Sequence, residues 1–257
     1  MNTQQQLIAL QTIVLKEIRR FLRIWPQTLL PPAITMGLYF VIFGNLIGSR
    51  IGEMGGFQYM QYIVPGLIMM SVITNSYANV ASSFFSTKFQ RSIEEMLVSP
   101  MPNYIILTGY IAGGMARGIM VGLIVMALSL FFTRLEVHNI FIILFVLVFT
   151  AGLFSIAGFL NGLLANKFDD ISIIPTFILT PLTYLGGVFY SIDLLPSFWQ
   201  QLSLANPIVY IVNAFRYGVL GVSDVNITTS IFMIFLFTVV LFLIALAMLK
   251  KGKGIRY

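Results

Sequence analysis

Residues 227–249 read ITTSIFMIFLFTVVLFLIALAML, a run of 23 positions without one charged side chain. A helix of about 20 apolar residues crosses a hydrocarbon core about 30 Å thick, so this run predicts a transmembrane helix. Five further stretches are long and apolar enough to do the same. The sequence therefore predicts six transmembrane helices, near residues 28–48, 61–86, 104–132, 140–165, 171–190 and 228–249.

The composition agrees with a chain that lies in lipid. Of the 257 residues, 58% are apolar and 9% are charged, against about 45–50% and about 25% in soluble domains. The predicted spans fill nearly all of the chain, so we expect an all-α membrane protein with a single domain over residues 1–257 and no separate catalytic domain. The chain has no cysteine, which excludes disulfides and thiolate metal sites.

Basic residues indicate the orientation, because loops kept in the cytoplasm are enriched in lysine and arginine. With the N-terminus inside, the outer side holds only Arg50, Arg134 and Arg216. The inner side then holds Lys16, Arg19, Arg20, Arg23, Lys88, Arg91, Lys167, Lys250, Lys251, Lys253 and Arg256. We therefore expect both termini in the cytoplasm, with membrane lipids and an acidic protein surface, and no nucleic acid, as counterparts of the net charge of +6.

The N-terminal segment has the pattern of an amphipathic helix. Its apolar residues recur at spacings of three and four: Leu7, Leu10, Val14, Ile18, Phe21 and Leu22. Charged residues occupy the remaining surface, and they precede the first span over too long a stretch for a cleavable signal peptide. We expect an interfacial helix in the membrane plane, with a solvated basic leader as the alternative.

The segment 88–100 predicts a short cytoplasmic helix. One face carries Phe89, Ile93, Met96 and Leu97, and the other faces carry Lys88, Arg91, Glu94 and Glu95. Such a helix can dock into a groove on a partner, where apolar side chains supply burial and charges supply specificity. The periodicity fits an interfacial helix equally well.

Residues 189–224 are too long for a simple turn and rich in aromatic side chains. Pro196 and Pro207 each stand where a helix can begin, because proline is tolerated in the first helical turn. We expect two short re-entrant outer helices between the fifth and sixth spans, with an ordinary outer loop as the alternative. Candidate residues of this outer region are Trp199, Asn206, Pro207, Tyr210, Arg216 and Tyr217.

Polar side chains inside the spans need partners or water. The second span carries Ser71, Asn75, Asn79 and Ser83 at intervals of four, which predicts either a translocation path or hydrogen bonding between helices. Arg117 interrupts the third span and either lines an inner cavity or extends to the inner interface.

Small residues and prolines predict how the spans pack. Glycines recur every four positions at Gly114, Gly118 and Gly122, and again at Gly158 and Gly162, which predicts close approach of helices. Pro175 and Pro181 predict kinks in the fifth span.

No catalytic or metal site is predicted. His138 is the only histidine, and the adjacent Asp169 and Asp170 would point some 100° apart on a helix. We interpret this acidic pair as a cap of the fifth span, or as a minor partner contact.

Several motifs together resemble the ABC-2 type transporter permeases, and the similarity covers essentially the whole chain. The run Gln90-Arg-Ser-Ile-Glu-Glu-Met-Leu-Val-Ser-Pro100 resembles their coupling segment, and Ile63-Val-Pro-Gly-Leu67 opens the second span as in that family. Further matches are Phe168-Asp-Asp-Ile171, the closing stretch 179–190, Leu195-Pro-Ser-Phe-Trp199, Asn206-Pro-Ile-Val-Tyr210 and Phe215-Arg-Tyr-Gly218. The likeness is greatest to the YadH-like bacterial inner-membrane permeases.

The resemblance implies the permease half of an exporter in the bacterial inner membrane. Two permease subunits, identical or homologous, would bind two copies of a separate ATPase, which would hold ATP and magnesium and act through residues 88–100. This chain would need no cofactor and would not itself be an enzyme, and it contains no G-x-x-x-x-G-K-[ST] phosphate-binding loop. An ion-coupled secondary carrier and a non-transporting membrane scaffold are the alternatives.

Overall fold

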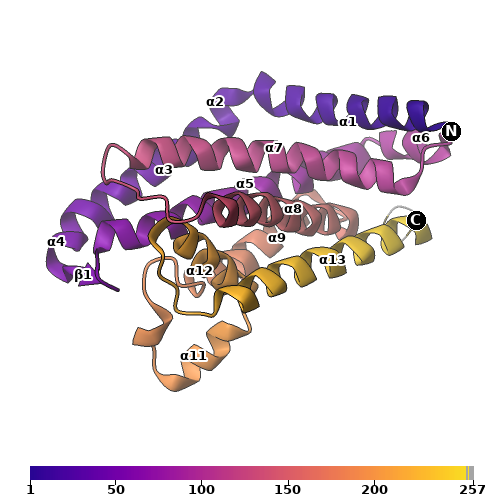
Figure 1. Cartoon of the computed structure of the whole chain (residues 1–257). Helices are drawn as coiled ribbons and strands as arrows, with labels where there is room; N and C mark the ends of the chain where they lie inside the picture. Colours follow the sequence, from indigo (N-terminus) through magenta and orange to yellow (C-terminus); the bar gives the residue numbers. More distant parts are fainter. Residues whose placement is uncertain (253, 255–257) are drawn as a thin grey trace.

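The computed structural model describes residues 1–252 and 254, so Lys253 and Arg256 of the charge argument lie outside the described residues. The described chain is almost entirely helical (Figure 1). The first half comprises α1 Thr3–Arg23, α2 Trp25–Thr28, α3 Leu30–Tyr39, η1 Phe40–Ile47, α4 Gly48–Ile51, β1 Glu53–Met54, β2 Phe57–Gln58, α5 Tyr59–Phe89, α6 Ser92–Val98 and α7 Asn103–Ser129. The second half comprises α8 Ile140–Leu164, α9 Phe168–Ile174, η2 Pro175–Leu179, α10 Thr180–Tyr184, η3 Ile192–Leu194, α11 Ser197–Leu204, α12 Pro207–Leu220 and α13 Ile227–Lys251.

Helix α5 is the centre of the molecule, with α7 and α8 packed against it (Figure 1). Glycines allow this close approach. A side chain at Gly118 of α7 would collide with Ser76 of α5, and one at Gly158 of α8 would collide with the carbonyl oxygen of Tyr77. The predicted role of these glycines in close packing is confirmed at both positions.

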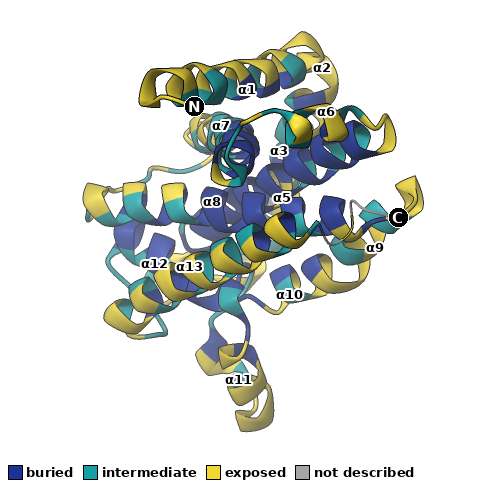
Figure 2. Cartoon of the chain, turned by 90° about the vertical axis from the view of Figure 1, so that its right-hand side faces the viewer, coloured by how far each residue is buried: buried dark blue, intermediate teal, exposed yellow. Residues whose placement is uncertain are grey.

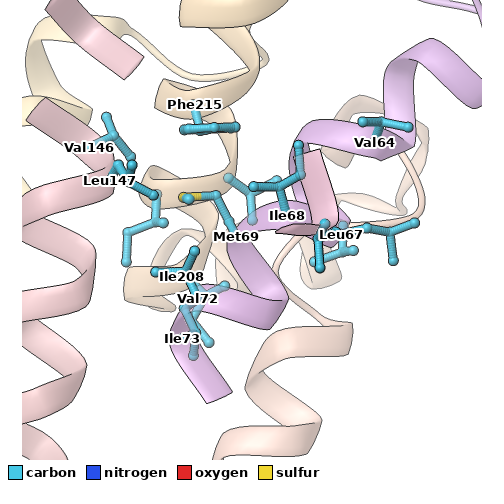
Figure 3. Close-up of a cluster of buried hydrophobic side chains, with 14 of the residues drawn as sticks. Val64, Leu67, Ile68, Met69, Val72, Ile73, Val146, Leu147, Ile208 and Phe215 are labelled. Atoms are coloured by element: carbon cyan, nitrogen blue, oxygen red, sulfur yellow. The ribbon is translucent and has the colours of Figure 1, made fainter. Parts of the chain in front are cut away.

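The apolar core extends from α5 to α8 and α12. Figure 3 shows Met69 of α5 close to Val146 of α8 and Phe215 of α12, and Leu67 and Ile68 of α5 belong to the same cluster. Helix α12 is buried over most of its length, which is why it lies in the core although the sequence placed it in an outer segment. The other outer helix, α11, projects from the rest of the molecule and is mostly exposed (Figure 2).

Five helical stretches in the described chain are long and apolar enough to cross a membrane: Trp25–Gly44, Tyr59–Phe89, Asn103–Ser129, Ile140–Leu164 and Ile227–Lys251. They match five of the six predicted spans. Helix α13 exposes most of its apolar surface (Figure 2), as expected of a helix whose neighbour is lipid rather than protein. Figure 1 places the start of α1, the end of α13 and α6 at one end of the molecule, and α4 and β1 at the other.

The segment predicted as the fifth span, 171–190, is shorter and interrupted. The helical backbone runs over residues 168–184 as α9, η2 and α10, which is 17 positions or about 26 Å. Pro175 begins the η2 stretch, where the helix widens, and Gly187 with a φ of +71° lies in the turn after α10. This length falls short of a hydrocarbon core about 30 Å thick, so the count of six spans stays a prediction.

Helix α1 is amphipathic as predicted, but its buried face differs from the predicted stripe. Leu7 and Leu22 are exposed, whereas Ile13 and Glu17 are buried against Gly109 and Gly113 of α7. Tyr104 at the start of α7 donates a hydrogen bond to Gln6, so the two helices run in the same direction along their contact. A position of α1 in the membrane plane stays a prediction.

A two-stranded hairpin, β1 paired antiparallel with β2, lies at the end of the molecule opposite the N-terminus and was not predicted. Its strands have two residues each, too few for an alternating pattern to register in the sequence. The two helices predicted to begin at Pro196 and Pro207 are present: Pro196 precedes α11, and Pro207 is the first residue of α12.

The glycine contact between α8 and α5 yields a stability prediction. Gly158→Ala places a methyl group against the backbone of Tyr77, and overpacking of this kind costs about 1–3 kcal/mol. Gly152→Ala, in the same helix, meets only Met115 Sδ at 3.8 Å and serves as the matched control. Thermal unfolding of the detergent-solubilised protein should show a lower midpoint for the first variant and an unchanged or higher one for the second. Equal midpoints would contradict the packing account.

Candidate functional site

Helix α6 follows α5 through a sharp turn at Arg91, whose φ of 58° is the only positive value at a non-glycine residue in the described chain. The turn exposes Phe89, Glu94, Glu95 and Val98. Val98 is the most exposed of them, with 87% of its surface accessible. The two carboxylates and Val98 therefore face outward at the end of the molecule that holds the start of α1 and the end of α13, whereas the ring of Phe89, the last residue of α5, lies edge-on to Phe168 of α9 with 4.9 Å between the ring centres.

The remaining predicted contact residues are divided between the two faces of α6. Arg91 is exposed, but Ile93 is only 1% exposed and packs within its own subunit. Met96 and Leu97 are partly buried on the same internal cluster. The apolar face of α6 that the periodicity predicts packs against the rest of its own subunit. Val98 was not among the predicted residues, because it does not belong to that apolar stripe.

A chain of hydrogen bonds fastens the base of α6 to the bundle. Ser92 Oγ donates to the carbonyl oxygen of Thr87 at 3.2 Å, and the Tyr110 hydroxyl donates to Thr87 Oγ1 at 2.9 Å. Lys16 Nζ of α1 donates to the Tyr110 hydroxyl at 3.2 Å. Although burial opposes it, the neighbouring Tyr110 and Glu17 raise the pKa of Lys16 above its ordinary value. Helices α1, α7, α5 and α6 are thereby linked.

A second connection joins the end of α5 to α8 and α9. Buried Lys88 donates through Nζ to the carbonyl oxygens of Leu163 and Ala165, at 2.9 and 2.6 Å. These are acceptors at the C-terminus of α8, where a cation is favourable. The backbone N–H groups of Asn166 and Lys167 donate to the Asp170 carboxylate and hold its pKa below the ordinary value. Asp170 therefore caps α9, as one of the two sequence interpretations holds.

The polar stripe of α5 faces the interior of the subunit. Ser71, Asn75, Asn79 and Ser83 are each 5% exposed or less. Asn75 Oδ1 accepts from Arg117 Nη2 at 3.1 Å, and Asn79 Oδ1 accepts from Arg20 Nη2 at 2.8 Å. In this conformation the two asparagines hold arginines and do not line an open surface.

Next to the polar stripe, one position earlier in the sequence at each turn, lie Thr74, Ala78 and Ser82, which form the uncovered line of α5. Thr74 is exposed, and the other two are partly exposed. Each of the two hydroxyls donates to a backbone carbonyl of its own helix, which satisfies it without a partner helix. The uncovered line therefore consists of small residues whose hydroxyl groups are already hydrogen-bonded within α5.

Arg117 contacts α5 and α2. Besides Asn75, its Nη2 donates to the carbonyl oxygen of Thr28 at 3.4 Å, and no acidic side chain among the described residues forms an ion pair with it. Glu17 was assigned to a solvated face but is fully buried, with Lys16 Nζ at 3.1 Å and Arg20 Nε at 3.3 Å. The small residues Gly109 and Gly113 opposite it were the available signal.

The predicted outer residues fall into two sets. Trp199 is exposed and Tyr217 is half-buried against the ring of His138, whereas Asn206, Pro207 and Tyr210 shape the start of α12. Asn206 Oδ1 accepts from the N–H of Ile208, its Nδ2 donates to the carbonyl oxygen of Leu182, and the Tyr210 hydroxyl donates to that of Leu204.

Arg216 is completely buried, although the sequence placed it in an outer loop. Its Nη2 donates to the carbonyl oxygen of Gly187 at 2.6 Å, and its guanidinium lies 3.9 Å from the centre of the Tyr62 ring. Asp224 lies 3.9 Å from Nη1 and also accepts from the N–H of Ile192 at 2.9 Å. This cluster joins α5, α12 and the segment after α10. Asp224 was not anticipated because two of its partners, Tyr62 and Ile192, are distant from it in sequence.

The described residues contain no group of three or more histidine, aspartate or glutamate side chains able to hold a metal ion. The arrangement leaves two exposed surfaces as candidates for function. One is the exposed face of α6, and the other is the uncovered line of α5.

Comparison with known proteins identifies the family of the chain. Residues 8–220 match the profile of the ABC-2 type transporter. The chain is 61% identical over 249 residues to the inner membrane transport permease YadH of Escherichia coli (strain K12), with 97% of each chain covered. It is 24% identical over 215 residues to nodulation protein J of Rhizobium leguminosarum bv. viciae, with 83% of each covered. With the match spanning most of its length, the chain belongs to the ABC-2 type transporter family.

Proposed function

We propose that this chain is the transmembrane permease subunit of an ABC exporter of the bacterial inner membrane, driven by ATP hydrolysis in a separate ATPase subunit. The observation that carries the proposal is the exposed face of α6, where Glu94, Glu95 and Val98 face away from the subunit beside the exposed Phe89 at the end of α5. An amphipathic helix of this kind docks by burying apolar side chains while its charges set specificity. Membership of the family and the likeness to YadH support the same function.

The proposed topology has six spans and both termini in the cytoplasm. The segment α9, η2 and α10 acts as a short fifth span, and α11 and α12 form the re-entrant outer region. The positions of α1, α6 and the end of α13 at one end of the molecule support this orientation (Figure 1). ATP and magnesium belong to the partner, and this chain supplies no catalytic residue.

The conduit, in this proposal, forms between two permease subunits along the uncovered face of α5. Thr74, Ala78 and Ser82 line it, while Asn75 and Asn79 hold Arg117 and Arg20 behind it. Arg117 therefore positions α5 rather than contacting cargo. Since α5 continues through Arg91 into α6, a push on α6 is transmitted directly to the lining helix.

Reversing charge on α6 should detach the ATPase. The double variant Glu94→Lys, Glu95→Lys places like charges against a complementary partner surface and should weaken association roughly tenfold or more. The measurement is the ATP hydrolysis that co-purifies with the tagged permease. Glu53→Lys, an exposed acidic residue at the opposite end, is the control. Undiminished hydrolysis with the double variant would contradict the docking role of α6.

Removing the Tyr110 hydroxyl should leave binding of the ATPase intact but weaken the coupling of ATP hydrolysis to transport. Tyr110→Phe breaks the links to Lys16 and Thr87 but leaves the exposed face of α6 unchanged. We expect the ATPase to bind normally while transport per ATP hydrolysed falls several-fold, with about 1 kcal/mol of stability lost. Tyr104→Phe removes the same atom from the same helix, where it bonds only Gln6 of α1, and should transport normally. Equal transport by both variants would rule out this route.

Cysteine labelling can locate the lining of the conduit, because the chain has no native cysteine. Thr74→Cys and Ser82→Cys should react with a membrane-impermeant maleimide at least about tenfold faster than Ser71→Cys and Ser83→Cys, since the reactive thiolate forms in water and not in an apolar interior. The comparison stays within one helix. If all four thiols react at the same slow rate in the assembled transporter, the uncovered face of α5 meets lipid or protein and not the conduit.

A further inference from the structure

A basic hollow of about 750 Å³ runs along the exposed surface of α1. Its lining includes four cationic side chains, Lys16, Arg19, Arg20 and Arg23, together with the apolar Leu15 and Ile24. Figure 2 shows α1 at the margin of the molecule with a largely exposed outer surface. Lys16 and Arg20 already bond to Tyr110 and Asn79 inside the subunit, whereas Arg19 and Arg23 have no part in the proposed docking helix α6 or in the uncovered line of α5.

The charge of the hollow is only partly compensated by the protein. Glu17 takes Lys16 and Arg20 as ion-pair partners, and Arg20 also donates to Asn79. Arg19 and Arg23 are exposed and form no ion pair among the described residues. With Glu17 the one carboxylate close to four cations, the hollow has an excess of positive charge that favours an anion.

The position of the hollow along the membrane normal corresponds to the inner interface. Helix α5 has 31 residues, or about 46 Å, against a hydrocarbon core of about 30 Å. Asn79, which binds Arg20, lies ten positions before the end of α5 at Phe89. That is about 15 Å, similar to the length by which α5 exceeds the core. With the first residue of α5, Tyr59, placed at the opposite boundary of the core, Arg20 lies near the boundary between acyl chains and headgroups.

The apolar neighbours indicate the kind of anion. Leu15 and Ile24 line the hollow, and the adjoining Leu22 and Trp25 are 39% and 52% exposed. Exposed leucine and tryptophan beside arginine are favourable where acyl chains meet headgroups, because each group then finds its own environment. A purely acidic surface of a soluble partner would satisfy the arginines and leave Leu22 and Trp25 in water, whereas a phospholipid supplies both an anionic headgroup and acyl chains.

We propose that this hollow binds the phosphate headgroup of an anionic phospholipid of the inner leaflet. Arg19 and Arg23, one helical turn apart, provide the contacts to the phosphate. Leu15, Ile24 and Trp25 lie against the first part of the acyl chains. The site is independent of the proposed transport function, since binding requires only the permease in a membrane.

The chain supplies its own reporter for this site. It has two tryptophans, Trp25 and Trp199, so Trp199→Phe leaves Trp25 beside Ile24 as the single fluorophore. The protein is reconstituted into phosphatidylcholine vesicles in which increasing fractions of lipid are replaced by brominated phosphatidylglycerol or, in parallel, brominated phosphatidylcholine. Bromine quenches only the tryptophan it touches, so the two titrations give the relative affinity of the site for the anionic headgroup.

We expect phosphatidylglycerol to bind at least about fivefold more tightly than phosphatidylcholine, the factor that one arginine beside an anionic surface supplies. Arg19→Gln with Arg23→Gln should reduce the ratio to near one. Arg50→Gln with Arg134→Gln, which removes two exposed arginines at the opposite end, should leave it unchanged. Gel filtration confirms that each variant is folded.

Two results would overturn the proposal. One is equal quenching of Trp25 by the two lipids in the parent protein. If Trp25 then becomes shielded only when the ATPase subunit is added, the arginines bind a protein partner and not a lipid. The other is a preference for phosphatidylglycerol that survives the loss of Arg19 and Arg23. Failure of either kind leaves the transport proposal intact, because ATPase binding through α6 is measured separately.

Discussion

The close approach of α7 and α8 to α5 is the constraint on which the remaining structure depends. Lipid is as apolar as leucine, so burial of apolar surface does little to hold helices together inside a membrane, and van der Waals contact must supply much of the attraction. Gly118 and Gly158 permit that contact, since each lies where a side chain would strike α5. Gly66 of α5 does the same toward Val188. The side chains of α5 are therefore divided between an interior face and one narrow uncovered line.

That division determines where the charged groups lie. Arg117 and Arg20 both reach α5, and each donates to the amide oxygen of an asparagine there, although Arg20 also pairs with the carboxylate of Glu17. Arg216 is satisfied mainly by a carbonyl oxygen and the face of Tyr62, with Asp224 at a longer distance. Oxygen acceptors without full charge avoid much of the desolvation cost of a buried ion pair. Each arginine thus joins helices at positions where the packed core ends.

The sequence predicts where helices occur much better than which face of each helix is buried. The uncharged run at 227–249 and the prolines at 196 and 207 act locally, so α13, α11 and α12 appear where expected. The orientation of the α5 stripe depends on Arg117 and Arg20, which come from other helices, and a repeat of four residues cannot distinguish a conduit from an internal network. Glu17 was misplaced for the same reason, because its burial follows from glycines in α7. The predicted fifth span extends to residue 190 because the apolar composition continues past Tyr184, whereas helix α10 ends at Tyr184 and the chain turns at Gly187.

The same rigidity that hides the polar stripe makes α5 suited to carry motion. A helix that is buried on most sides moves as a unit, because packed interiors change between discrete arrangements and deform little. Its end is bonded through Lys88 to α8 and through Thr87 to α7, so a displacement of α6 acts on three helices together. The hydroxyls on its uncovered line bond only within α5. In the proposed function, force therefore enters at the α6 end of α5 and the uncovered line meets the cargo, while Asn75 and Asn79 keep the helix aligned through Arg117 and Arg20.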